Sequence, residues 1–565
     1  MRRIISWSSF IFLLHPKSAM IMVFLLFETH YFAIAQNKKS KIDEINITSR
    51  FKPSIVKTGK LEFYPEVPLK DTNAFNFNYI FEAISFKTPL SSFSLKPLAY
   101  QAPEGVLDVN NTFLKIGGGN LNTPFLSAAY QHRFDKNLFS FAADHISSKG
   151  QFPNQQYANS KLLGKFTRKI ADNQFYTVNL GYSRDEYRNY GYDTAKFRFT
   201  NDELKQTYNR FSLIANYDLV SGSNSRLFLK PTLKFDFLTT RRGVNEANVH
   251  LDVPVHYEVS NNVNINAAFN VDYTNLNSTS AINNSISLFQ LPVKVAYLVD
   301  GLYASGGIIS VLKNNKIIFA PDAKLVYTFK EGSSFRILGG ISNTFNVNAL
   351  QKLYQINPFL LTPDQLTIYQ QTNYYAGFDW LNAKGLQLRS KLGLVKFKNL
   401  PLFINSISNE QILSGKDFLV LYEESANAFF IESSLAYIFS DKLSFATAFN
   451  AYSFQSQKTY DDPYGFLPIE LNMNLKWNPF SPLIFKLNGQ VFGGNMALEA
   501  VNKRTKTKGI LDLGFAVDYK LNKKWGFWID LNNIANTKYQ RWNGYTSFGF
   551  NFLLGVRFNF IQLAQ

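Results

Sequence analysis

The sequence contains no cysteine, few charged residues and no long apolar run beyond its first 35 positions. Only 18% of the 565 residues are Asp, Glu, Lys or Arg, against about 25% in a typical soluble protein. The absence of cysteine excludes disulfide scaffolds, thiol catalysis and cysteine-ligated metals. A membrane-spanning helix needs about 20 apolar residues in succession, and no stretch after Ala35 approaches that length. The composition is therefore unusual for a soluble protein.

The first residues, MRRIISWSSFIFLLHPKSAMIMVFLLFETHYFAIAQ, are predicted to form a secretory signal peptide over residues 1–35. Arg2 and Arg3 precede an apolar run from Met20 to Phe27, and Ala33 to Ala35 supplies the small residues of a cleavage site. The alternative is a single membrane anchor, for which the run is short. We therefore expect an exported protein.

Aromatic residues and strand-like alternation are abundant. The chain contains 54 Phe and 30 Tyr, and from about residue 111 onward apolar and polar residues alternate, as in a β-strand whose two faces meet different surroundings. The clearest examples are VNINAAFNVDY at 263–273, IELNMNLKW at 469–477 and SFGFNFLLGVRFNF at 547–560. In the last, the row from Phe548 to Phe560 is expected to face lipid and the Gly, Asn and Arg row to face a lumen.

Short polar turns alternate with long connections along the chain, which is typical of membrane barrels with turns at one end and loops at the other. About 22 strands fit between Thr112 and Phe560. The predicted fold is all-β: a transmembrane antiparallel β-barrel over residues 111–560. It follows a short extended segment at 36–110, in the periplasm or the lumen, and precedes a tail at 561–565. Aromatic residues near strand ends are expected to form interfacial girdles, namely Trp477, Tyr519, Trp525, Trp542 and Tyr545.

The C-terminal stretch WGFWIDLNNIANTKYQRWNGYTSFGFNFLLGVRFNF resembles the final two strands of TonB-dependent outer-membrane receptors. The resemblance implies a 22-stranded barrel with a plug in its lumen and a short box near the mature N-terminus that binds an energy-coupling protein. Residues 36–110 are shorter than such a plug and contain no recognisable box, so the chain is closer to the plug-reduced or plugless barrels of Bacteroidetes. The residues that carry the resemblance, called the barrel-closing motif below, are Asn532, Asn533, Tyr539, Gly544, Gly555, Phe558 and Phe560.

Candidate chemistry is sparse. In VHLDVPVHYEV the side chains of His250, Asp252 and His256 fall on the polar face of one strand and are candidates for a lumen-facing ligand site. The two histidines are about 20 Å apart at a rise of about 3.3 Å per residue, so they cannot bind one metal ion without partners on other strands. Asp144 and His145 point to opposite faces of a strand and form no dyad. We expect no enzymatic activity, no cofactor and no resident metal.

The leading functional expectation is ligand reception or transport across the outer membrane of a Gram-negative bacterium. The alternative is a non-transporting barrel that serves as a scaffold or subunit of an outer-membrane complex. Expected partners are outer-membrane lipid, the barrel-assembly machinery, which the resemblance implies would recognise the aromatic last strand, and a periplasmic or outer-membrane protein. The net charge of +18 is dispersed along the chain, so nucleic acid is not an expected partner. The polar lumen rows do not identify the substrate.

Overall fold

The computed structural model describes residues 112–560 except for short gaps at 172–173, 220–225, 279–283, 314–315, 330–334, 382–384, 408–412 and 501–502. The expected signal peptide, the segment at 36–110 and the tail at 561–565 lie outside the described residues.

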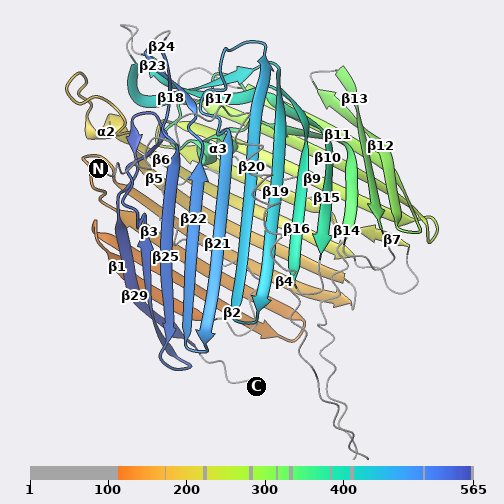
Figure 1. Cartoon of the computed structure of the whole chain (residues 1–565), viewed down its shortest axis with the longest axis horizontal. Helices are drawn as coiled ribbons and strands as arrows, with labels where there is room; N and C mark the ends of the chain where they lie inside the picture. Colours follow the sequence, from red (N-terminus) through yellow and green to blue (C-terminus); the bar gives the residue numbers. More distant parts are fainter. Residues whose placement is uncertain are drawn as a thin grey trace, which may run out of the picture. The chain divides into compact units, whose positions relative to one another are not determined.

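The described strands close into one antiparallel barrel with 22 strand positions (Figure 1). The first and last strands meet in register, from the pair Phe113 and Asn559 to the pair Gly119 and Leu553. One position is shared by two short strands, because Pro231 lacks the N–H that a continuous ladder needs. The predicted fold class is thus confirmed. The barrel strands are β1 (Phe113–Gly119), β2 (Thr123–Phe134), β3 (Asn137–Ser148), β4 (Tyr157–Ala171), β5 (Gln174–Arg188), β6 (Lys205–Leu219), β7 (Leu227–Leu229), β8 (Thr232–Thr240), β9 (Val244–Glu258), β10 (Val263–Ser278), β11 (Asn284–Val299), β12 (Leu302–Lys313), β13 (Lys316–Thr328), β14 (Phe335–Val347), β15 (Ile368–Leu381), β16 (Leu386–Lys398), β19 (Ala426–Ser440), β20 (Leu443–Gln457), β21 (Ile469–Phe480), β22 (Leu483–Phe492), β25 (Ile510–Lys520), β26 (Trp525–Asn532) and β29 (Asn551–Asn559).

The two ends of the barrel differ in their connections. At the end where β1 begins and β29 ends, called the turn end, strands are joined by short turns such as 135–136, 441–442 and 521–524. The longest connections lie at the opposite end, called the loop end. They contain α2 (Asn201–Leu204), α3 (Leu350–Ile356), β17 (Leu400–Ile407), β18 (Leu413–Glu423), β23 (Met496–Ala500), β24 (Lys503–Lys506), β27 (Gln540–Trp542) and β28 (Tyr545–Thr546). Within the described ranges, neither α2 nor α3 has the length or the apolar composition that a membrane crossing requires.

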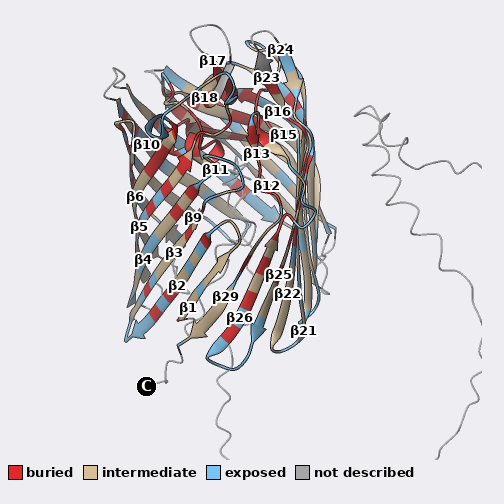
Figure 2. Cartoon of the chain, turned by 90° about the vertical axis from the view of Figure 1, so that its left-hand side faces the viewer, coloured by how far each residue is buried: buried red, intermediate tan, exposed pale blue. Residues whose placement is uncertain are grey.

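The outer wall is apolar, as the alternation predicted. Outward-facing Phe269, Ile469 and Leu554 are 46%, 43% and 50% exposed, although each is large and apolar. Buried residues concentrate toward the loop end, at the top of Figure 2. An apolar belt around a polar interior is what a lipid environment requires of a barrel.

The C-terminal strand is shorter than expected. Strand β29 begins at Asn551, whereas residues 547–550 belong to the preceding connection. The expectation that Phe548 faces lipid is therefore wrong: its ring packs against Tyr157 on the inner wall, with ring centroids 5.7 Å apart. From Phe552 onward the predicted alternation holds, with Leu554 outward and Leu553 buried inside.

Strands β13 and β14 pair along only part of their length. Their register runs from Ala323 opposite Ile341 to Thr328 opposite Arg336, at the turn end. Toward the loop end, within the described residues, 316–322 of β13 pair only with β12, and 342–347 of β14 pair only with β15.

Apolar packing replaces the missing pairing. Ile309 and Val311 of β12 share a buried cluster with Phe345 and Val347 of β14. Pro321 lies on the open edge of β13, a position that tolerates its missing N–H, and its carbonyl accepts a hydrogen bond from Asn343 Nδ2 at 2.7 Å. The wall thus overlaps itself at this point.

Candidate functional site

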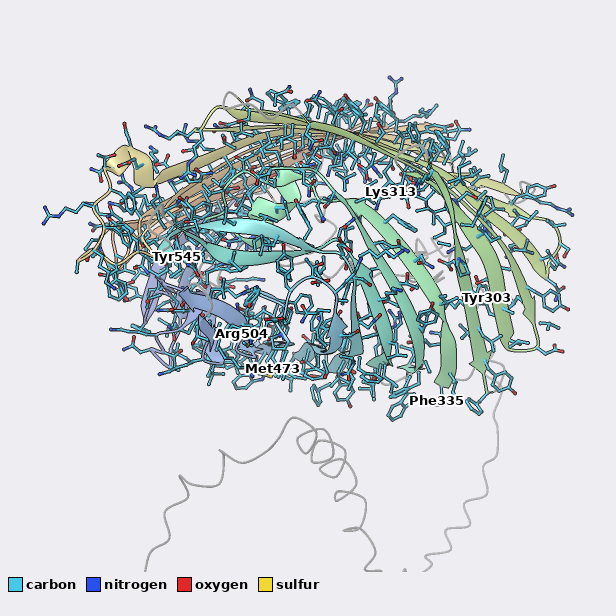
Figure 3. All side chains as sticks on the ribbon, turned by 90° about the horizontal axis from the view of Figure 1, so that it is seen from above. Tyr303, Lys313, Phe335, Met473, Arg504 and Tyr545 are labelled. Atoms are coloured by element: carbon cyan, nitrogen blue, oxygen red, sulfur yellow. The ribbon has the colours of Figure 1, made fainter. Side chains whose placement is uncertain are left out.

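Three connections of the loop end fold into the barrel interior and are called the loop cap: 348–367 with α3, 399–425 with β17 and β18, and 533–550 with β27 and β28. Figure 3 looks onto the ring of strands, with β17 and β18 crossing it and Tyr545 inside. The largest buried hydrophobic cluster joins residues of all three connections to the inner faces of β3 to β10. The cap is therefore packed onto the wall.

Aromatic side chains form the centre of the loop cap. Tyr545 stacks on Phe359 with ring centroids 3.8 Å apart and an interplanar angle of 27°. Phe418 of β18 contacts Trp542 at 5.5 Å in a T-shaped arrangement. Contacts of this kind contribute about 0.5–1.5 kcal/mol beyond the burial of their area. Each pair joins two different connections, so the three connections support one another.

A carboxylate of the wall holds the start of α3. The residue before the helix is Ala349, which has no side-chain cap, and the carboxylate of Glu246 on β9 accepts the N–H groups of Leu350 and Gln351 instead. Glu246 is 1% exposed. A negative group at a helix N-terminus satisfies otherwise unpaired donors, so Glu246 attaches the cap to the wall.

A second attachment joins β18 to the loop-end connections that follow β5 and β8. The carboxylate of Asp417 accepts hydrogen bonds from Asn189 Nδ2, in the connection after β5, and from Arg242 Nη2, in the turn after β8. Arg242 lies 3.0 Å from Asp417. Lys416 Nζ also lies 3.6 Å from Asp417 Oδ2. Because Asp417 is 5% exposed, removal of Arg242 would leave this buried charge only partly compensated.

A third attachment is aromatic. Tyr208 of β6 stacks on Tyr354 of α3 with ring centroids 4.3 Å apart, and its hydroxyl donates to the carbonyl of Pro358 at 3.1 Å. The contacts between the loop cap and the wall thus include a carboxylate clamp, an ion pair and a tyrosine stack.

Glu423 organises the rim of the cap beside β20. Its carboxylate accepts backbone N–H groups from Ser425, Lys458, Thr459 and Tyr460. Burial alone would raise the pKa of Glu423, but the four donors favour the ionised form and lower that pKa below its usual value. Glu423 is therefore a fixed anion at neutral pH.

Arg541 of β27 lies within the cap. Its Nη2 donates to the carbonyl of Gly465 at 2.9 Å, and its guanidinium lies 4.0 Å from the centre of the Trp542 ring. Burial lowers the pKa of Arg541 to about 9, while the charge of Glu470 acts in the opposite direction. The cap thus contains buried charge as well as aromatic surface.

Two of the expected girdle residues belong to this cap. Trp477, Tyr519 and Trp525 are 46%, 42% and 45% exposed, as a girdle at the turn end requires. Trp542 and Tyr545 are 3% and 2% exposed, so their assignment to a girdle is wrong. Their connection folds inward because its aromatic groups bury more surface against α3 and β18 than a solvated loop would.

The structure places His250 and His256 on the inner face of β9 but in separate contacts. His250 Nδ1 lies 3.4 Å from Asp272 Oδ2, and His256 Nδ1 lies 2.6 Å from Asn266 Oδ1. Asp252, between them, is in register with Asn270. Among the described residues, no group of three or more His, Asp or Glu side chains has the arrangement of a metal site. The structure thus does not bring the two histidines together.

Some residues of the barrel-closing motif stabilise the connection after β26, and others lie at the seam, where β29 pairs with β1. Asn533 adopts a φ of 46° and donates through Nδ2 to the carbonyls of Thr537 and Phe548, both at 2.7 Å. Asn532 Nδ2 donates to Asn551 Oδ1, and the Tyr539 hydroxyl donates to Asp512.

The remaining motif residues are two glycines, which the backbone geometry requires, and two phenylalanines, which pack near the end of the last strand. Gly544 has a φ of +88°, a conformation that favours glycine. Gly555 of β29 faces Gly117 of β1, and a Cβ on Gly555 would lie 2.0 Å from the Ile116 carbonyl oxygen. Phe558 packs against Trp525 and Phe560, with ring centroids 4.7 and 4.8 Å apart. Gly555 therefore belongs to the closing seam itself.

Below the cap the inner wall carries charges of both signs. Some lysines there are paired across strands: Lys294 with Asp322 at 2.9 Å, and Lys486 with Asp518 at 2.7 Å. Lys115 lies 3.9 Å from Asp530 and 3.9 Å from the Trp528 ring centre. This arrangement suits a wall that meets water and polar ligands.

Comparison with known proteins shows which solved structures share this fold. No protein-family model and no curated protein sequence matches the chain. Solved structures do match: the siderophore receptor PirA from Acinetobacter baumannii, with a TM-score of 0.61 at 10% identity over 81% of each chain. The FrpB iron transporter from Neisseria meningitidis gives 0.61 at 11% identity over 80% of this chain and 82% of that one. A variant of the ferric enterobactin receptor PfeA from Pseudomonas aeruginosa gives 0.59 at 11% identity, over 80% and 81%. The chain thus has the fold of the TonB-dependent-receptor type of 22-stranded barrel, as its C-terminal stretch implied.

Proposed function

We propose that this protein is an outer-membrane receptor of a Gram-negative bacterium that binds a ligand at its loop end and transports it through the barrel. The observation that carries the proposal is the combination of a closed 22-position barrel with an apolar outer belt and a polar lumen. A closed barrel with this apolar outer surface is suited to a membrane, where the belt contacts lipid and the polar interior contacts water.

In this proposal the loop end faces the exterior and the turn end faces the periplasm, which is the usual orientation of outer-membrane barrels. The last strand, with Phe558 and Phe560 on its outer row, is then presented to the barrel-assembly machinery from the periplasmic side. The signal peptide predicted at 1–35 supplies the export that this location requires.

The loop cap supports regulated passage in preference to an open pore. A passive channel needs a continuous aqueous path, whereas α3, β17 and β18 fold into the interior and pack against the wall in two buried clusters. A ligand that enters from the loop end must displace or bind this cap. The cap therefore has the position of a receptor surface and of a barrier.

The structural neighbours suggest the first ligands to examine. Their titles name siderophores, iron and ferric enterobactin, and we propose ferric siderophores as the first class of candidate ligands. Uptake of ⁵⁵Fe-labelled ferric enterobactin by cells that produce the protein, compared with cells that lack it, examines this choice directly.

Conductance measurements test the transport proposal itself. The full-length protein is reconstituted in planar bilayers beside a variant in which residues 399–425 are replaced by a short turn, so that β17 and β18 are removed. We expect low conductance from the wild type and a several-fold increase from the variant. Equal conductance of the two proteins would contradict a cap that blocks a transport route and would favour the scaffold alternative.

A further inference from the structure

Four cationic side chains gather on one area of the inner wall below the cap. Lys324 of β13, Arg336 of β14, and Arg389 and Lys391 of β16 face the lumen around a single aspartate, Asp379 of β15. Asp379 Oδ1 lies 2.9 Å from Arg389 Nε, and its Oδ2 lies 3.7 Å from Arg336 Nη2. The one carboxylate is therefore taken by the two arginines.

The two lysines have no ion-pair partner among the described residues. Of the other carboxylates that face this area, Asp322 is paired with Lys294 at 2.9 Å. Glu432 lies in register with Lys391 and within its electrostatic reach, and it accepts a hydrogen bond from the Tyr452 hydroxyl at 3.1 Å. Lys324 and Lys391 are half-buried and lie within electrostatic reach of each other. Neighbouring like charges in a partly desolvated place repel one another, and an anion between them removes that repulsion.

The register of the strands leaves room between the two lysines. Gly340 of β14 lies opposite both Lys324 and Tyr375, and Gly377 of β15 lies opposite Lys391. The Tyr375 hydroxyl extends over Gly340, since a Cβ built on that glycine would lie 3.1 Å from it. Lys391 Nζ lies 5.0 Å from the centre of the Tyr375 ring. Two lysines and a tyrosine with its hydroxyl thus lie beside two residues that have no side chain.

We infer that Lys324, Lys391 and the Tyr375 hydroxyl form a binding site on the lumen wall for an oxyanion that carries two or more negative charges. The inference deepens the proposed function and rests on it, because the lumen is the route that a transported ligand would follow. The site lies in the turn-end part of the strands, beyond the cap, so a ligand would meet it after the loop end. Phosphate-bearing and polycarboxylate compounds share the required chemistry.

Isothermal titration calorimetry on the full-length protein in detergent tests the site, with inorganic pyrophosphate and citrate as the two probes. We expect saturable binding of at least one probe, weakened by added salt because the attraction is ionic. The double variant K324Q/K391Q is expected to lose at least tenfold in affinity, and Tyr375→Phe several-fold. Binding of pyrophosphate alone would assign a phosphate ligand, and binding of citrate alone a carboxylate ligand.

A matched control removes the same charge elsewhere. The double variant K230Q/K486Q alters two lysines that are ion-paired to Asp218 and Asp518, and its affinity is expected to change less than twofold. Loss of binding in both double variants, or no saturable binding by the wild type, would overturn the site. If K324Q/K391Q fails to give a heat-modifiable folded band on a gel, Tyr375→Phe and the single variants replace it. Binding without any conductance after cap removal would contradict the transport proposal and leave the site standing.

Discussion

Tyr545 stacks on Phe359 at a centroid distance of 3.8 Å, and this contact joins the last connection of the barrel to the connection that carries α3. Phe359 is 1% exposed and Tyr545 is 2% exposed. The Tyr545 hydroxyl also donates to the carbonyl of Lys416, next to the Asp417 ion pair. One tyrosine therefore links all three connections of the loop cap.

Replacement of Phe359 by alanine is expected to loosen the cap. Removal of a large buried aromatic side chain costs about 3–5 kcal/mol. Because the hydrogen bonds between the barrel strands are unchanged, this loss lowers the free energy needed to open the cap. Hydrogen exchange measured by mass spectrometry is expected to show faster exchange in 348–367 and 533–550. Phe319→Ala, at an outward residue that is 67% exposed, is the control; an equal effect there would contradict the role of the stack.

Asp417→Asn tests the ion pair that attaches β18. The substitution keeps the shape but removes the charge that Arg242 and Asn189 contact, and we expect a loss of about 1–3 kcal/mol in cap opening. The readout is protease sensitivity of β17 and β18 in the reconstituted protein. Glu424→Gln removes an exposed pair with Lys458 and should have little effect; matching sensitivity of the two variants would argue against an attachment at Asp417.

The rim of the cap is expected to weaken in acid. The pKa of Glu423 is lower in the folded protein than in the unfolded chain, where it is near 4.5. Its contribution to stability is therefore complete above pH 4.5 and is lost as the pH falls through the lower folded value. The protection of the amides at 458–460, expressed relative to the intrinsic exchange rate at each pH, should fall from pH 5 to pH 3 in the wild type but change less in Glu423→Gln. An identical pH response in both proteins would exclude this carboxylate as the cause.

Gly555→Val is expected to prevent closure of the barrel. A Cβ at this residue would lie 2.0 Å from the Ile116 carbonyl oxygen, across the seam between β29 and β1. The expected result is loss of the folded, faster-migrating band in unheated gel samples. Gly164 on β4, where a Cβ would meet nothing within 4 Å, supplies the control Gly164→Val. Normal folding of the Gly555 variant would show that the seam tolerates a side chain.

Much of the barrel could be predicted from the sequence because its signal is local. Alternation with a period of two sets the outward rows of Ile469 and Phe269 within single strands, and the connection lengths separate the two ends. The shortening of β29 could not be read in this way, because Phe548 continues the alternating pattern although its ring packs on Tyr157.

The loop cap and the anion site depend on contacts between distant parts of the chain. An aromatic residue near a strand end has the same local sequence whether it meets lipid, as Trp525 does, or a core, as Trp542 does. Likewise, Lys324 and Lys391 become neighbours only through the register of four strands. No periodicity in the sequence indicates that register, although the glycines at 340 and 377 indicate where the inner wall has no side chain.

The overlap between β13 and β14 has a mechanical consequence for the barrel. At the turn end every strand position is joined to both neighbours by a backbone ladder, so the circumference there is set by hydrogen bonds. Toward the loop end, residues 316–322 and 342–347 are held across the overlap by apolar contacts and the Asn343 side chain. Contacts of that kind slide at lower cost than ladder bonds break. The rim that surrounds the cap can therefore widen while the opposite rim keeps its diameter.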